Sequence, residues 1–302
     1  MNPAQSHLLS LQRDDGGWGT ASTSPSTTEA TALSVLALSG TDDPDASRSA
    51  RLGLAWLRER QRRDGSWPVS DQVPRSCWMT SLAVLALAGS PSDRPLALNG
   101  AGWILNQEGR PVPWFNRLFF FLFPKYDVID LDLELKGWSW FEGTFGWVEP
   151  TAYALLALKR LREDLPESPT AYRVAEGERL LLDRVCKGGG WNYGNSRVYD
   201  EELWPYADTT ALTLLALQDR PGLLEVRSGL QALDRMVARN GSLLATALAV
   251  LCRCVYGRPS EALKHRIMAH LGVESPWIDV RALALAGLAL REDRPCLAID
   301  HA

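Results

Sequence analysis

The chain of 302 residues has a formal net charge of −4, with 46% apolar and 23% charged residues. This composition is typical of a globular protein with an ordinary core, and without a basic stripe it argues against a nucleic-acid partner. The five cysteines are odd in number and scattered, which favours a reducing compartment over a disulfide framework. The start of the chain lacks the features of a secretory signal, so we expect a cytoplasmic protein.

A string rich in alanine and leucine recurs along the chain. Copies begin at Thr31, Thr80, Thr151, Thr210 and Thr246, and a looser sixth copy begins at Arg281. Each copy is apolar on nearly all sides, which predicts a helix that is buried all round. Between the copies lie segments of mixed polarity with helical spacing, at roughly residues 45–62, 97–107, 170–185, 225–239 and 260–271.

This alternation predicts an all-α protein, a single (α/α)6 toroid over residues 1–302 with six inner and six outer helices. A closed ring removes the exposed ends that an open solenoid must cap. A curved open solenoid is the alternative. An aromatic-rich insertion at about residues 110–147 departs most from the repeat.

The junctions between the helices carry a second motif, Gln-x3-Gly-x-Trp, at Gln12–Trp18 and again at Gln61–Trp67. We expect Gly16 or Gly17 to end an outer helix, because glycine adopts the left-handed cap conformation at little cost. The Gln12 side chain can bind backbone groups left unpaired at helix ends. Trp18 then covers this polar junction, so the motif predicts a structural clasp between outer helices.

These motifs, together with Gly188–Gly194, resemble those of the squalene-hopene cyclase and protein prenyltransferase β-subunit superfamily. The resemblance implies the same toroid, an isoprenoid ligand and, for the cyclases, carbocation chemistry started by a carboxylic acid. Aligned on Thr210, the proton-donating aspartate of the cyclase Asp-x-Asp-Asp-Thr-Ala motif falls on Asp208. Tyr206 and Thr209 stand where that motif has its first and third acids.

Acids lie two residues before four of the six repeated strings, and Trp78 and Leu244 take the other two positions. The candidate catalytic residues are Asp208 as proton donor, Glu149 and Asp279 as groups that tune it, and Glu29. A carboxyl in a shared apolar chamber has its pKa raised by desolvation and can donate a proton. The alternative role for each acid is helix capping and compensation of the helix dipole.

Aromatic residues gather in the loops that enter the buried helices. The candidate substrate-binding residues are Trp78, Trp138, Trp140, Trp147, Trp191, Tyr193, Trp204, Tyr206 and Trp277. Their faces can stabilise a carbocation or bind a neutral polyprenyl chain. The alternative is that they fill the toroid and leave no room for a ligand.

No zinc ligand set can be assembled from the four histidines and the helix starts, which argues against zinc-dependent prenyl transfer. We expect no cofactor and no metal. In the insertion, the apolar run Leu118–Phe123 is a candidate for peripheral membrane contact, or for a lid that folds over the toroid.

The function favoured by the sequence is thus a terpenoid cyclase-like or prenyltransferase-like protein that binds an isoprenoid in the toroid cavity. The alternative is a non-catalytic toroid that binds a lipid or a second protein subunit. A carbohydrate-active toroid with paired carboxylates is a third and weaker possibility.

Overall fold

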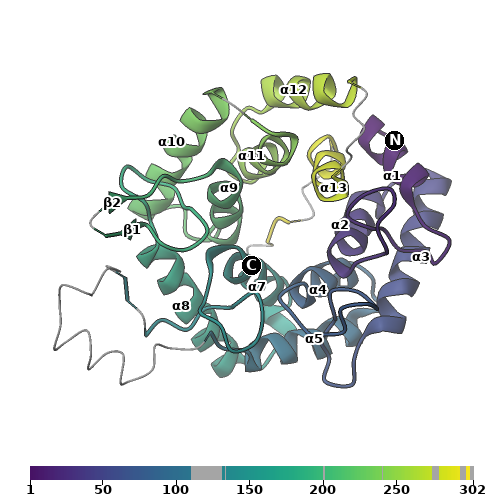
Figure 1. Cartoon of the computed structure of the whole chain (residues 1–302), viewed down its shortest axis with the longest axis horizontal. Coiled ribbons are helices and arrows are strands. Elements are labelled where there is room, and N and C mark those ends of the chain that lie inside the picture. Colours follow the sequence, from purple (N-terminus) through teal and green to yellow (C-terminus); the bar gives the residue numbers. More distant parts are fainter. Residues whose placement is uncertain are drawn as a thin grey trace.

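The computed structural model describes residues 1–109, 131–132, 134–199, 201–239, 241–273, 279–292 and 297–299. In these residues the helices form two concentric layers around a ring (Figure 1). The inner helices are α2 (Thr28–Leu38), α4 (Thr80–Ala88), α7 (Val148–Arg160), α9 (Ala207–Ala216), α11 (Leu243–Val255) and α13 (Val280–Ala289). The outer helices are α1 (Pro3–Leu11), α3 (Pro44–Arg60), α5 (Arg94–Asn106), α8 (Glu167–Asp183), α10 (Leu224–Arg239) and α12 (Glu261–Leu271). Two small elements are the 3-10 turn η2 (Arg162–Asp164) and an antiparallel hairpin of β1 (Arg197–Val198) and β2 (Glu201–Glu202).

The ring is closed by its last inner helix. Helix α13 packs beside α11 on one side and α2 on the other, and α1 covers α13 from outside (Figure 1). The predicted toroid is therefore confirmed, and the open solenoid is wrong. The closure brings the first and last repeats into direct contact.

The inner helices are buried on all sides, as their alanine-rich and leucine-rich sequences predict. All nine residues of α4 are buried, and α7 is buried from Val148 to Lys159. The outer helices bury one face only. In α3, for example, Leu54, Trp56 and Leu57 are buried while the charged residues face solvent. The two layers therefore follow directly from the two kinds of hydrophobic pattern.

The predicted clasp fastens α1 to α3 and α3 to α5. The Gln12 side-chain amide donates to the carbonyl oxygen of Gly16 at 2.8 Å and to that of Ser49, on α3, at 2.9 Å. Gln61 repeats this arrangement with Gly65 at 3.1 Å and Leu96, on α5, at 2.9 Å. One expectation was wrong, because α1 ends at Leu11 and Gly16 takes its positive φ of 85° in the following turn, not at a helix end.

A tryptophan and a threonine complete each of these two clasps, and two further clasps, at Trp138 and Trp191, keep this pair without the glutamine. The Trp18 indole N–H donates to the carbonyl of Leu8 at 2.8 Å, and its backbone N–H donates to the Thr31 hydroxyl at 3.0 Å. Three further tryptophans make the same two bonds, to Leu57 and Thr80 from Trp67, to Ile104 and Thr151 from Trp138, and to Leu181 and Thr210 from Trp191. The threonine that opens the strings of α2, α4, α7 and α9 thus ties each of these four inner helices to the outer layer.

The clasp indoles lie against glycines in the outer helices. A Cβ added to Gly100 of α5 would lie 2.6 Å from Cγ2 of Val84 and 2.8 Å from the Trp67 ring. Gly53, Gly177 and Gly229 have the same relation to Trp18, Trp138 and Trp191. Glycine at these places lets the outer helix approach the inner one closely.

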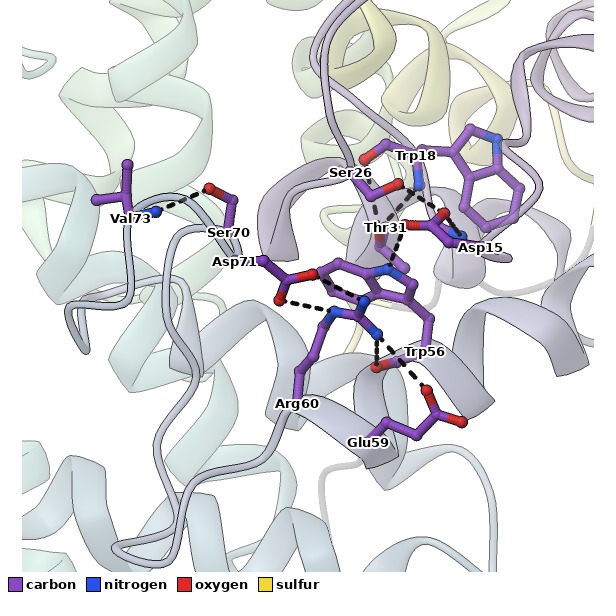
Figure 2. A network of polar contacts seen from close by, with 11 residues as sticks. Asp15, Trp18, Ser26, Thr31, Trp56, Glu59, Arg60, Ser70, Asp71 and Val73 are labelled. Carbon is purple, nitrogen blue, oxygen red and sulfur yellow. Dashed lines mark hydrogen bonds and ion pairs between the residues drawn. The ribbon is translucent and has the colours of Figure 1, made fainter.

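A polar network supports the first clasp (Figure 2). The Asp15 carboxylate accepts from the Gly17 backbone at 3.0 Å, the Ser26 hydroxyl at 2.8 Å and the Trp56 indole at 3.0 Å. The Arg60 guanidinium lies 4.1 Å from the centre of the Trp56 ring. Although partial burial raises the pKa of Asp15, these hydrogen bonds outweigh it and hold the pKa below its usual value.

Candidate active site at the leading ends of the inner helices

The inner helices all begin at the same end of the ring, which we call the leading end; we call the other the trailing end. Loops of 16 residues or more enter α2, α4, α7 and α9 at their N-termini from the previous outer helix, and shorter connections leave these four helices. The first turns of α2, α7, α9 and α13 therefore lie around one opening, and each contributes a charged residue: Glu29, Glu149, Asp208 and Arg281.

Arg281 joins two of the predicted acids across the ring. Its Nη2 donates to Oε1 of Glu149 in a close ion pair, and its Nε lies 3.5 Å from Oε1 of Glu29. The Glu149 side chain is 3% exposed, that of Glu29 12% and that of Arg281 23%. Three ionisable groups from three different repeats therefore share one largely buried volume.

Burial controls the ionisation of this triad. It raises the pKa of Glu29 to about 6; the Arg281 charge opposes the rise, and the charges of Glu149 and Asp279 add to it. Burial also raises the pKa of Glu149, against the lowering effect of Arg281. For Arg281, the acidic neighbours Tyr153, Glu149 and Glu29 outweigh burial and raise the pKa further, so it stays cationic. The triad thus holds a permanent positive charge between two carboxyls whose pKa values are raised.

Stacked aromatic rings stand beside the triad. Trp78 stacks on Tyr153 with ring centres 5.5 Å apart, and the Trp140 ring meets Trp78 edge-on at 5.2 Å. The Tyr153 side chain is completely buried, and its pKa is raised by that burial. A cavity of about 20 Å³ beside Trp78 and Trp140 has space for one water molecule, so a larger ligand would have to meet these rings from another side.

Asp208 occupies the edge of the opening. It is half-buried, and its Oδ2 accepts a hydrogen bond from the Tyr193 hydroxyl at 3.1 Å. Tyr193 also packs against Tyr206, with ring centres 5.5 Å apart. Burial, then the charge and hydrogen bond of Asp208, raise the pKa of Tyr193 to about 12. Asp208 therefore lies near the triad without a direct bond to it, and its charge contributes to the raised pKa of Glu149.

The other predicted residues have different surroundings. Asp279 is exposed and caps α13, because its Oδ1 accepts from the Arg281 backbone at 3.0 Å. The indoles of Trp138 and Trp191 are enclosed in clasps and are not available to a ligand. Trp147 is half-buried and packs against Gly194, whereas Trp204 is 83% exposed.

Some predictions lie outside the described residues. These are Trp277, the run Leu118–Phe123 and most of the insertion. In the part of the chain that the structure describes, no helix combines the length and the apolar character needed to cross a bilayer.

Two members of the site escaped the sequence analysis. Tyr153 stands third in its repeated string, where most copies have leucine, and Arg281 stands first, where the other copies have threonine. Both residues therefore depart from an otherwise regular repeat, and this departure is the feature of the sequence that could have identified them as site residues. A large polar or aromatic residue inside a buried helix needs a partner; Arg281 pairs with the two carboxyls, and the ring of Tyr153 stacks on Trp78.

A closed helical ring with a buried acid–arginine triad at its leading end defines the chain as an (α/α)6 toroid protein with a candidate acid site. Residues 1–131 match the model of the squalene-hopene cyclase N-terminal domain. The predicted resemblance to the squalene-hopene cyclase-like superfamily is thereby confirmed. No curated protein sequence matches the chain.

Solved structures share the fold at low identity. The type II terpene cyclase MstE from Scytonema is 16% identical with a TM-score of 0.59, over 96% of this chain and 95% of that one. Its complex with the substrate geranylgeranyl dihydroxybenzoate matches with a TM-score of 0.53 at 17% identity, over 90% of this chain and 75% of that one. The α-1,6-mannanase GH76A of Salegentibacter is 11% identical with a TM-score of 0.61, over 95% and 96% of the two chains. These matches establish the toroid alone, because the same ring serves different chemistries.

Proposed function

We propose that the chain is a terpenoid cyclase-like enzyme that binds an isoprenoid at the leading end of the ring and starts its reaction by proton donation. One observation carries this proposal: two buried carboxyls, Glu29 and Glu149, flank Arg281 beside the stacked rings of Trp78 and Tyr153. This set combines a store of acidic protons with faces that stabilise a cation.

The charges of the triad favour one stored proton. With both carboxyls ionised, the pair and Arg281 carry a net charge of −1 in a largely buried volume; with one proton retained, the triad is neutral. Because burial disfavours net charge, the triad favours the state with one proton, and burial accordingly raises the pKa of Glu149 and that of Glu29, the latter to about 6. Arg281 stabilises the carboxylate that remains after donation, which makes the protonated pair a stronger acid.

The proposed reaction is an isomerisation. The carboxyl O–H adds its proton to one carbon of an alkene, and the π electrons form the new C–H bond and leave a tertiary cation. The next alkene of the chain attacks this cation, which forms a C–C bond and moves the charge along the substrate. Loss of a proton from the final cation, returned through solvent to the carboxylate, ends the cycle. The faces of Trp78 and Trp140 can each contribute about 0.5–2 kcal/mol to a nearby cation.

The likeness to MstE supports this class of substrate. That type II terpene cyclase was crystallised with an isoprenoid substrate, geranylgeranyl dihydroxybenzoate. The domain match over residues 1–131 points in the same direction. Asp208, at the edge of the opening, would then act through its charge on Glu149.

The test is product formation from neutral polyprenyl substrates in deuterated buffer. Carboxyl protons exchange with solvent, so the wild-type product should carry one deuterium from the initiating step. We expect Glu29→Gln and Glu149→Gln to lower the rate by about 100-fold or more, as is typical for loss of a general acid. Glu202→Gln, on the exposed strand β2, is the control and should retain full activity. Full activity in both triad variants would remove the proton-donor role.

A second candidate function is binding without turnover, with a lipid or a second protein subunit as the partner. It is favoured by Tyr206 and Thr209, which replace two acids of the cyclase motif, and by the half-exposed position of Asp208. This function predicts that an isoprenoid co-purifies with the protein and that no product forms from it. Mass spectrometry of organic extracts distinguishes the two candidates.

A further inference from the structure

The trailing end of the ring, where the inner helices stop, contains a short segment of the chain itself. Residues Leu297–Ile299 lie inside the ring, against α7 and the end of α9 (Figure 1). Leu297 and Ile299 are buried as part of the hydrophobic core. This segment lies far from the leading end, so its role does not depend on the proposed function.

One glutamine binds the backbone of this segment on one edge. The Gln218 side chain donates through Nε2 to the carbonyl of Leu297 at 3.0 Å and accepts through Oε1 from the Ile299 N–H at 2.9 Å. A strand in a β-sheet offers its neighbour the same pair of groups, the carbonyl of residue i and the N–H of residue i+2. Gln218 is itself 3% exposed, so the pairing takes place away from bulk water, where an unmade hydrogen bond is costly.

An arginine binds the segment between these two points. Arg160, the last residue of α7, donates through Nη1 to the carbonyl of Ala298 at 3.0 Å. Leu297 and Ile299, on either side of Ala298, are both buried in the hydrophobic core. Three consecutive residues are thus bound through their backbone groups, while the two larger side chains fill an apolar surface.

The segment also forms part of the wall of a large cleft. This cleft has a volume of about 840 Å³ and runs between the end of α7 and one face of α8. Its apolar lining comes from Ala88, Leu165, Ala171, Val174, Ala175 and Ile299, and its other lining residues, apart from Thr170, are charged. Ile299 therefore stands between this cleft and the core of the ring, and its removal would widen the cleft toward the interior.

We propose that the trailing end is a binding groove for an extended apolar peptide, and that residues Leu297–Ile299 occupy it as an intramolecular latch. Gln218 and Arg160 recognise the backbone of the peptide, and the core accepts its alternate side chains. The latch closes the trailing end, so a ligand reaches the ring only from the leading end. Release of the latch opens the cleft.

The first test is amide hydrogen exchange in the full chain. Gln218→Met keeps the volume of the side chain but removes both hydrogen bonds to the segment. We expect exchange at the Ile299 amide to accelerate by at least tenfold, while exchange in α2 stays as in the wild type. Gln61→Met, which removes a comparable pair of bonds in a clasp, is the matched control and should leave Ile299 unchanged. Equal exchange at Ile299 in the Gln218 variant and the wild type would overturn the latch.

The second test supplies the segment as a separate peptide. The double substitution Leu297→Asp and Ile299→Asp, in the full chain, should release the latch and leave the groove intact. A fluorescent peptide of residues 292–302, kept reduced, should then bind with saturation of its anisotropy, and Gln218→Met added to this variant should weaken binding by at least tenfold. The conservative pair Leu297→Met and Ile299→Val should bind no peptide. Peptide binding to the wild type, or none to the released variant, contradicts the proposal.

Discussion

The Nε atom of Arg281 lies 3.5 Å from Oε1 of Glu29, although the two residues belong to the last and the first inner helices of the ring. Closure of the toroid creates this contact, because α13 must pack against α2 for the two side chains to meet. The same arginine binds Glu149, on α7, from the opposite side of the ring. Assembly of the acid site is therefore coupled to completion of the fold.

Substitution of Arg281 should lower the stability of the fold, because the acid site and the closed ring form together. In Arg281→Met the two carboxyls lose their cation while they remain buried, and breaking a buried ion pair costs about 3–5 kcal/mol. We expect a loss of this size in the free energy of unfolding at pH 7.5, and a smaller loss at pH 5, where the carboxyls are more fully protonated. Urea unfolding at both pH values measures it. A loss that is the same at both would mean that the charge of the two carboxyls does not change between these pH values.

Glu29 should make the wild-type fold more stable at low pH than at neutral pH. Its pKa rises from 4.5 to about 6 on folding, so the folded state binds more protons than the unfolded state between these values. Stability from this group is fully present below pH 4.5 and is lost as the pH rises through 6. A shift of this size corresponds to about 2 kcal/mol.

Glu29→Gln should remove this dependence. The variant should be more stable than the wild type above pH 7 by up to about 2 kcal/mol, and the difference should vanish below pH 4.5. Glu59→Gln, on the exposed face of α3, serves as the control and should follow the wild-type curve. A Glu29 variant whose stability changes with pH as the wild type does would contradict the raised pKa.

The threonine of each clasp should matter through its hydroxyl. In Thr151→Val the backbone N–H of Trp138 loses its acceptor, and a buried donor without a partner costs about 1–3 kcal/mol. Thr151→Ser keeps the hydroxyl and should lose much less. Thermal and urea unfolding of the two variants separate the hydrogen bond from the shape of the side chain, and equal stabilities would argue against the clasp bond.

Two glycines of α5 provide a matched pair. Gly100→Ala places a methyl group against Val84 and Trp67, and overpacking of this kind costs about 1–3 kcal/mol. Gly102→Ala has no atom within 4 Å of the new methyl and should gain up to about 1 kcal/mol from helix propensity. Opposite signs in the measured free energies of unfolding are the expected result. A stabilised Gly100 variant would mean that the layers can separate without loss.

The regular parts of the fold could be predicted from the sequence because each repeat carries its own signal. The strings that begin at Thr31 and Thr80 are apolar all round, and the clasp residues Gln12 and Trp18 recur with the same spacing. Local patterns of this kind decide which helices are inner and which are outer. They do not reveal which helix ends face each other across the ring.

The candidate site could not be predicted in the same way, because it depends on which helix ends face each other. The sequence favoured Asp208 by its alignment with a family motif, whereas the structure brings Glu29 and Glu149 together through Arg281. Trp138 and Trp191 were assigned to a ligand, but their position after an outer helix is the one that Trp18 has in its clasp. Which side chains meet across the ring depends on the three-dimensional fold. Whether a tryptophan belongs to a clasp or to a ligand site depends on it as well.

The clasps hold the inner and outer helices together whatever the length of the loops at the opening of the ring. The tryptophan and threonine of three clasps are 13 residues apart, yet Trp191 and Thr210 make the same bond although they are 19 residues apart. The longer loop holds the β1–β2 hairpin without disturbing the two anchors that bracket it. Loops of different length and composition can therefore be grafted between such anchors, which makes this protein a scaffold on which new binding surfaces can be selected while the helices stay as they are.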